Sequence, residues 1–387
     1  MNHKTLKKIL DLPNRDSFFV EILDKLEDFC ELEYCSFYKF ETNEGIIPAL
    51  KFCKNKNLEA VKYLKVFVGA QHNEYNGLFG IIEFLEKIKK GQKDIEDILR
   101  DDQHIIFFPL MNPYGFKNPG KNNKSGYYLK NGSNLNRFWR RTFAPEFENG
   151  KNDLDEYSIP EHAKHVKSFL SPYWEKEDIT IYLLDFHETS LLRRFPKELS
   201  LKLNEKSITY KFDHWLKEGI ILNVIKLYDI PYYRKPLFYK CDSSAEHTHL
   251  NLSIKQIDTV YEKLLQYLSE NQGKLPFYFC YSNKSEEYCK RLANKVYEKV
   301  GDILWDTYYP AFDHHFHDHG CFVKMSDATS RDNVLTMELE SEKHFYKIFE
   351  EVKLSRKDPQ YYEERLDLIN KGLKLAITSI ETMISLF

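Results

Sequence analysis

Four short apolar segments, each followed at once by polar residues, constrain the fold of this chain most strongly. They are residues 66–70, 104–110, 179–186 and 334–339. Short apolar runs bounded by polar or turn residues are typical of buried β-strands. Amphipathic segments that predict helices lie between and after them, at 77–90, 160–170, 285–300 and 359–387. Strands that alternate with helices predict an α/β fold with a mixed, mostly parallel sheet and helices on both of its faces.

The residues that follow these segments are of the types that bind metals and move protons. They are Gln71, His72 and Glu74, then Asn112, then Asp185 and His187, and finally Glu338 and Glu340. The carboxyl ends of parallel strands meet at one edge of a sheet, so we expect these side chains to lie close together. A catalytic zinc ion needs three protein ligands and a nearby carboxylate to act as general base. The sequence therefore predicts a metal-dependent hydrolytic site.

Composition narrows the class of protein further. The 387 residues are 42% hydrophobic, which supports a substantial core, and the net charge of −3 carries no sign of a nucleic-acid-binding track. We find neither the apolar core of a signal peptide nor the roughly 18 apolar residues of a membrane span. The seven cysteines are scattered without a C-x-x-C pair, which favours free thiols in a reducing compartment. We expect a cytoplasmic protein that binds neither nucleic acid nor membrane.

Five motifs along the chain together resemble those of the M14 metallocarboxypeptidase superfamily, which includes the succinylglutamate desuccinylase and aspartoacylase branch. They are GAQHNE, NPYGF, NLNRFW, LLDFHET and LTMELE, in this order, between about residue 70 and residue 340. Each motif is weak alone, but their order makes the resemblance specific. It implies one M14-like domain over 1–387 with a zinc-carboxypeptidase-like sheet. The long interval between the fourth and the last motif fits an inserted subdomain at about 200–300, and residues 1–60 would form an N-terminal extension.

The resemblance implies that Gln71, Glu74 and His187 bind one zinc ion. Gln71 stands where most of the family has histidine, and the nearest pattern is that of the D,L-carboxypeptidases with Gln, Glu and His ligands. An amide oxygen is a harder donor than imidazole, so we expect weaker zinc binding. His72 is the alternative first ligand, because positions i and i+2 of an extended backbone point the same way and would pair it with Glu74. Asp185 is a candidate hydrogen-bond partner of His187.

The same motifs imply the catalytic and substrate-binding residues. Glu338 corresponds to the general base, although Glu340 lies on the same face of its strand. Arg137 is predicted to hold the terminal carboxylate of the substrate through paired hydrogen bonds, with help from Asn136. The histidine-rich run at 313–320 is expected at the mouth of the site, with His317 as a substrate-binding candidate.

The function that these motifs indicate first is that of a zinc carboxypeptidase that removes the C-terminal residue of a peptide or muropeptide. The alternative is a desuccinylase-like or aspartoacylase-like amidohydrolase that acts on a small N-acyl amino acid, since Arg137 suits any substrate with a carboxylate. A second alternative is a relative that binds peptides without cleaving them, which the Gln71 substitution keeps open. The sequence leaves the oligomeric state open.

Overall fold

The computed structural model describes the main part of the chain. The described residues are 15–118, 126–144, 157–189, 209–210, 233–238, 246–251, 262–263, 266, 269–305, 311–313, 321–342 and 359–386. Within these residues no helix is long and apolar enough to cross a membrane. His317 lies outside the described residues, as do most of residues 253–269, a segment for which the sequence also predicts a helix.

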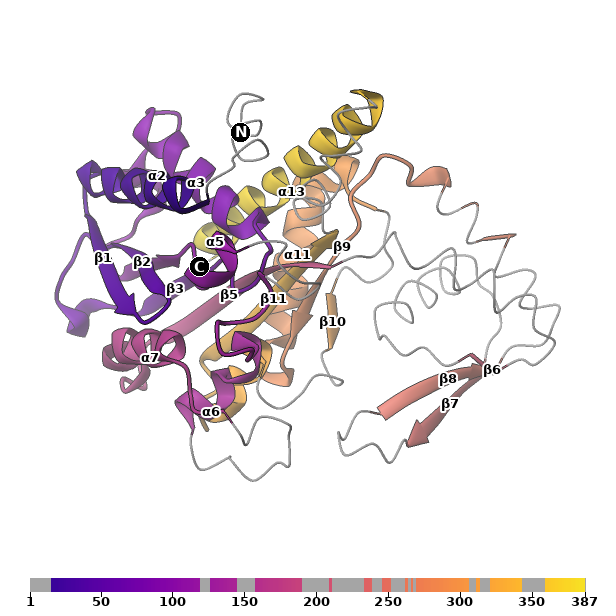
Figure 1. Cartoon of the computed structure of the whole chain (residues 1–387). Helices are drawn as coiled ribbons and strands as arrows, with labels where there is room; N and C mark the ends of the chain where they lie inside the picture. The colour runs from indigo at the N-terminus through magenta and orange to yellow at the C-terminus, as the bar shows by residue number, and fades with distance from the viewer. Residues whose placement is uncertain are drawn as a thin grey trace.

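An eight-stranded mixed sheet forms the centre of the fold (Figure 1). In spatial order its strands are β1 (Cys35–Thr42), β2 (Gly45–Phe52), β4 (Gln103–Phe108), β3 (Tyr63–Val68), β5 (Thr180–Thr189), β11 (Val334–Glu342), β9 (Phe277–Tyr281) and β10 (Ala311–Asp313). Strands β4, β3, β5 and β11 run parallel to their neighbours in this series. Strands β1 and β2 are antiparallel at one side, and β9 is antiparallel to β11 at the other. The predicted α/β sheet is confirmed.

Helices cover both faces of the sheet, as Figure 1 shows. One face carries α2 (Arg15–Glu27), α3 (Asn76–Lys89), α11 (Glu286–Val300) and α13 (Pro359–Ser385). The opposite face carries α6 (Trp139–Phe143), α7 (Glu161–Trp174) and the 3₁₀ segment η7 (Phe322–Ala328). Shorter helical segments are α4 (Ile95–Ile98), α5 (Pro113–Lys117), η1 (Asp28–Glu31), η2 (Leu58–Ala60), η3 (Leu135–Arg137), η5 (Asn283–Ser285) and η6 (Gly301–Ile303).

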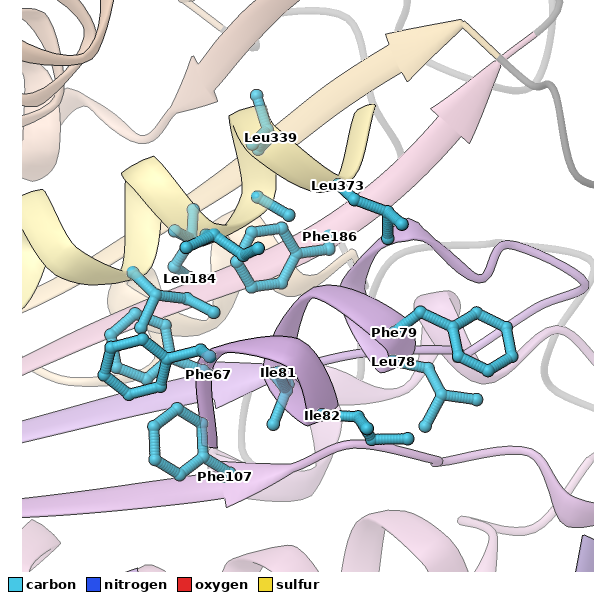
Figure 2. Close-up of a cluster of buried hydrophobic side chains, with 14 of the residues drawn as sticks. Phe67, Leu78, Phe79, Ile81, Ile82, Phe107, Leu184, Phe186, Leu339 and Leu373 are labelled. Atoms are coloured by element: carbon cyan, nitrogen blue, oxygen red, sulfur yellow. The ribbon is translucent and has the colours of Figure 1, made fainter. Parts of the chain in front are cut away.

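The larger apolar core lies between the sheet and helices α3 and α13 (Figure 2). Phe67, Leu184 and Leu339, from three adjacent strands, point towards these helices and are at most 2% exposed. Burying each such side chain contributes about 1.5–3 kcal/mol. A Cβ atom on Gly77 would lie 2.5 Å from Cβ of Phe186, so glycine is needed for the start of α3 to approach β5 this closely. This close packing fixes the position of the loop between β3 and α3.

Strands β2 and β9 of the main sheet were not predicted, and each has a physical reason. Strand β2 contains Pro48, which cannot donate to a strand ladder. The structure tolerates it because Pro48 pairs with β1 alone, while β4 pairs only with Leu50–Phe52. Strand β9 is an aromatic run, FYFCY, that is buried on both faces and so shows no alternation of apolar and polar residues.

The predicted N-terminal extension and inserted subdomain stay predictions of domain organisation. Strands β1 and β2, from within residues 1–60, belong to the main sheet. Between 200 and 300, β6 (Thr209–Tyr210), β7 (Tyr233–Phe238) and β8 (Glu246–Asn251) form a separate three-stranded sheet, whereas β9 and α11 belong to the main fold.

Candidate active site

The chain bends sharply where β3 ends, and this bend sets the direction of the first site residues. Ala70 has a φ of +46°, in the left-handed region that residues other than glycine rarely adopt. The backbone N–H groups of Met111 and Asn112 donate to the carbonyl oxygens of Gly69 and Ala70, at 3.3 and 3.0 Å, and hold the bend in place. The side chains of Gln71 and His72 therefore do not continue the alternation of the strand.

Three side chains with metal-binding atoms meet beyond this bend. The ligand atoms of His72, Glu74 and His187 all lie within 4.8 Å of one another, and all three residues are buried. An oxygen of Glu74, Oε2, is 3.5 Å from His72 Nδ1 and 2.8 Å from His187 Nδ1. The structure thus brings together the alternative first ligand, His72, with the other two predicted ligands.

The hydrogen bonds of His72 leave its Nδ1 atom turned towards this group. The Asn134 side-chain oxygen accepts a backbone hydrogen bond from Asn136 at 2.9 Å, so it also accepts from His72 Nε2, at 2.8 Å. Burial lowers the pKa of His72, which keeps the ring neutral. The lone pair is then on Nδ1, a buried atom without a hydrogen-bond partner in the structure. Tyr127 stacks on the ring, with centroids 4.1 Å apart, and fixes its plane.

His187 is held by a carboxylate at each of its ring nitrogens. Its Nε2 is 2.6 Å from Asp185 Oδ2, and its Nδ1 is 2.8 Å from Glu74 Oε2. Burial opposes protonation of the ring, but the carboxylates of Asp185, Glu74 and Glu338 raise the pKa of His187 well above its usual value. A divalent cation bound at Nδ1 would take the place of a proton on that atom.

Gln71, the first ligand predicted from the family spacing, uses both polar atoms of its side chain in hydrogen bonds. Its oxygen accepts from the indole N–H of Trp139 at 2.7 Å, and its amide nitrogen donates to Asp185 Oδ2. Gln71 is 1% exposed, and these two hydrogen bonds tie it to Trp139 and Asp185. Gln71 as a metal ligand stays a prediction, and these contacts favour His72.

Glu338 lies beside His187 on the neighbouring strand β11. Asn136 Nδ2 donates to Glu338 Oε1 at 3.2 Å, and the same oxygen is 3.8 Å from His187 Nε2. Asn136 is itself fixed, because its oxygen accepts from the backbone N–H of Phe322 at 2.7 Å. Burial raises the pKa of Glu338 and moves it towards neutral pH. Glu340 pairs in register with His187, and burial raises its pKa to about 8.

Arg137 lies close enough to act on this group. It is partly buried, and its Nη1 donates to the Asn136 carbonyl oxygen at 2.7 Å. Burial raises the pKa values of Glu338 and Tyr127, and the charge of Arg137 partly offsets this rise. Of the other predicted substrate-binding residues, Asn136 joins the site, whereas His317 lies outside the described residues.

Three residues of the site escaped the sequence analysis as contributors to it. Tyr127 follows a segment rich in Gly, Asn and Lys, a composition typical of a surface loop. In the structure Gly126, with a φ of +84°, packs against Asn73, and Tyr127 stacks on His72. Asn134 and Trp139 lie in the NLNRFW motif, but nothing in their spacing indicates hydrogen bonds to His72 and Gln71.

The residues present fit a divalent cation. Two neutral imidazoles and one carboxylate are the donor set of many catalytic zinc sites, and His72 Nδ1 is a buried nitrogen with no hydrogen-bond partner among the described residues. The buried carboxylates of Asp185 and Glu338 lie 2.6 and 3.8 Å from His187 Nε2, close to this group. The other convergent group, Asp185, His187 and Glu338, would use His187 Nε2, which already donates to Asp185. The first group is therefore the better candidate.

Comparison with solved structures shows which known proteins have a similar fold. A metallo-carboxypeptidase from Pseudomonas aeruginosa, in complex with (2-guanidinoethylmercapto)succinic acid, superposes with a TM-score of 0.50 at 11% identity, over 94% of this chain and 67% of that one. The fold is that of the metallocarboxypeptidases. A provisionally assigned carboxypeptidase A from Shewanella denitrificans gives the same TM-score and identity, over 95% of this chain and 68% of that one. No family model and no curated protein matches the chain. The resemblance seen in the motifs is confirmed at the level of this metallocarboxypeptidase fold.

Proposed function

We propose that this protein is a metal-dependent hydrolase, and within that class a zinc carboxypeptidase that removes the C-terminal residue of a peptide. The convergence of His72, Glu74 and His187 beside buried Glu338 is the observation that supports the proposal most. The metallocarboxypeptidase fold adds support, since it brings strands β3, β5 and β11 together at this edge.

His72, Glu74 and His187 would hold the ion, and Zn²⁺ is the ion that this donor set suits best. Bound there, it would supply a Lewis acid that polarises a scissile carbonyl and makes a water molecule more acidic. Asp185 orients His187, and Asn134 and Tyr127 orient His72, so the ligands are positioned before the ion binds.

Glu338 would act as the general base. Its carboxylate takes a proton from the attacking water and returns it to the leaving amine. Asn136 holds Glu338 Oε1 by a hydrogen bond of 3.2 Å, so the base has a fixed direction. The raised pKa of the buried carboxyl suits a group that must both accept and donate the proton near neutral pH.

Metal content of the purified protein tests the ligand set. Wild type is expected to bind about one zinc ion, and His72→Ala to lose it, because the site would keep only two of its ligands. Gln71→Ala is expected to retain zinc at saturating concentration. Elemental analysis after dialysis, with release of C-terminal residues from peptides assayed alongside, gives the answer.

The opposite pattern, with zinc lost in Gln71→Ala and kept in His72→Ala, would restore the ligand set inferred from the family spacing. A wild-type protein that binds no zinc after reconstitution would contradict the hydrolase proposal and leave a peptide-binding protein.

Arg137→Ala is expected to raise KM for peptides by about 10–100-fold with a smaller effect on kcat, because a charged hydrogen bond is worth about 1.5–3 kcal/mol. Arg137→Lys should recover part of this loss, since lysine keeps the charge but not the paired N–H groups. Arg141→Ala, on the next helical segment α6, is the control, because Arg141 donates to the carbonyl oxygen of Tyr157. If wild type cleaves C-terminally amidated peptides as readily as free ones, Arg137 does not recognise a carboxylate.

A further inference from the structure

A chain of buried hydrogen bonds extends from the site into the protein interior. Trp139 Nε1 donates to Gln71 Oε1 at 2.7 Å, and Gln71 Nε2 donates to Asp185 Oδ2. The same carboxylate oxygen is 2.6 Å from His187 Nε2. These four side chains are at most 5% exposed, so water does not compete for their hydrogen bonds.

Trp139 fixes the direction of every hydrogen bond in this chain. An indole N–H can only donate, so the Gln71 oxygen must accept and the Gln71 amide nitrogen must donate to the next group. The Asp185 carboxylate can only accept, from Gln71 and from His187 Nε2. His187 therefore carries a proton on Nε2, and Nδ1, which lies 2.8 Å from Glu74 Oε2, is the ring atom left to bind a cation.

One further contact could have reversed this assignment. Asn136 Nδ2 lies 3.3 Å from His187 Nε2, and a hydrogen bond there would require a ring nitrogen without a proton. The contact to Asp185 is much shorter, at 2.6 Å, and is charge-assisted, so it decides the position of the proton. Asn136 Nδ2 instead donates to Glu338 Oε1 at 3.2 Å.

We propose that Gln71 is a positioning residue that, with Trp139, orients Asp185 and thereby His187, and so sets the affinity of the site for a divalent cation. The proposal rests on the function proposed above, since it assumes that His187 is a ligand. Gln71 would then have no contact with the ion. Loss of a partner of this kind lowers metal affinity by about 10–100-fold, whereas loss of a ligand abolishes tight binding.

The test is the Zn²⁺ dissociation constant, measured by competition with a chromophoric chelator, for wild type, Trp139→Phe, Gln71→Ala and the double variant. Trp139→Phe keeps an aromatic ring against Phe322, whose centroid is 5.5 Å away, and removes the N–H. Each single variant is expected to weaken binding by about 10–100-fold. The double variant should bind no more weakly than Gln71→Ala, because both changes break one chain of hydrogen bonds.

Trp174→Phe is the matched control. Trp174 packs against Phe143, with centroids 4.4 Å apart, in the same apolar core but outside this chain of hydrogen bonds. Its substitution is expected to leave zinc affinity unchanged, which separates general loosening of the core from loss of the N–H donor. If Gln71→Ala does not fold, the comparison of Trp139→Phe with Trp174→Phe still decides the matter.

Unchanged zinc affinity in both single variants overturns the proposal, and so do additive effects in the double variant. A Gln71→Ala protein that loses zinc as completely as Glu74→Ala also overturns it, because Gln71 would then be a ligand. Failure of the proposed function has a different signature, namely a wild-type protein that binds no zinc or a Glu74→Ala protein that binds it as wild type does.

Discussion

Replacing Glu338 by glutamine is expected to lower kcat by about 10²–10⁴-fold, the usual contribution of a general base, while zinc content stays at the wild-type level. The glutamine oxygen can still accept the hydrogen bond that Asn136 donates at 3.2 Å, so the shape of the site should persist. Only the ability to take a proton is lost. Steady-state kinetics on a peptide substrate and elemental analysis of the same preparation provide the two measurements.

Glu340→Gln is the control for this variant, since Glu340 lies on the same strand, two residues along, and pairs in register with His187. Its substitution is expected to reduce kcat far less. If Glu340→Gln is the inactive variant and Glu338→Gln retains activity, the general base is Glu340 and the assignment by motif position is wrong.

Replacing Lys65 by methionine is expected to raise the free energy of unfolding at pH 7 by on the order of 3 kcal/mol. Lys65 is fully buried in β3, with its amine 3.7 Å from the centroid of the Tyr182 ring. Burial and the charge of Arg100 lower its pKa to about 7. In the unfolded chain the amine keeps its ordinary pKa of about 10.4 and is charged at pH 7. Folding must therefore either bury this charge or remove the proton, and both cost free energy.

The pH dependence of unfolding provides the measurement. Between pH 7 and 9.5 the unfolded chain holds one more proton at Lys65 than the folded protein, so wild-type stability should rise with pH relative to that of Lys65→Met. Below pH 7 both states are charged and the difference should become constant. Lys62→Met, an exposed lysine three residues earlier, is the control. Parallel stability profiles for wild type and Lys65→Met would show that Lys65 keeps an ordinary pKa in the fold.

Sequence patterns were sufficient for the parallel centre of the sheet and for the helices that cover it. The four predicted apolar segments are β3, β4, β5 and β11, because each is long and apolar enough to be buried on both faces. Strand β2 could not be predicted because Pro48 argues against a strand, and only its one-sided pairing makes that residue acceptable.

The choice between Gln71 and His72 could not be made from the sequence, because it depends on one backbone angle. The family spacing indicated Gln71, and the two-residue period of an extended chain indicated His72, but the left-handed conformation of Ala70 ends the strand before both residues. The hydrogen bond from Trp139 to Gln71 joins residues 68 positions apart and leaves no local signal. By contrast, the Asp185–His187 contact follows from the two-residue period of a strand and was predicted as a candidate pair.

The position of β11 has a consequence for how the protein is made. β11 is the last described strand along the chain, yet it lies in the interior of the sheet between β5 and β9. At roughly 5–20 residues per second, a ribosome needs on the order of 10–30 s to travel from the end of β5 to the start of β11. Throughout that time β5 presents an open edge to other chains. Incomplete chains that end before Val334 are therefore expected to aggregate readily. Such chains also lack Glu338, even when they carry the metal-binding residues.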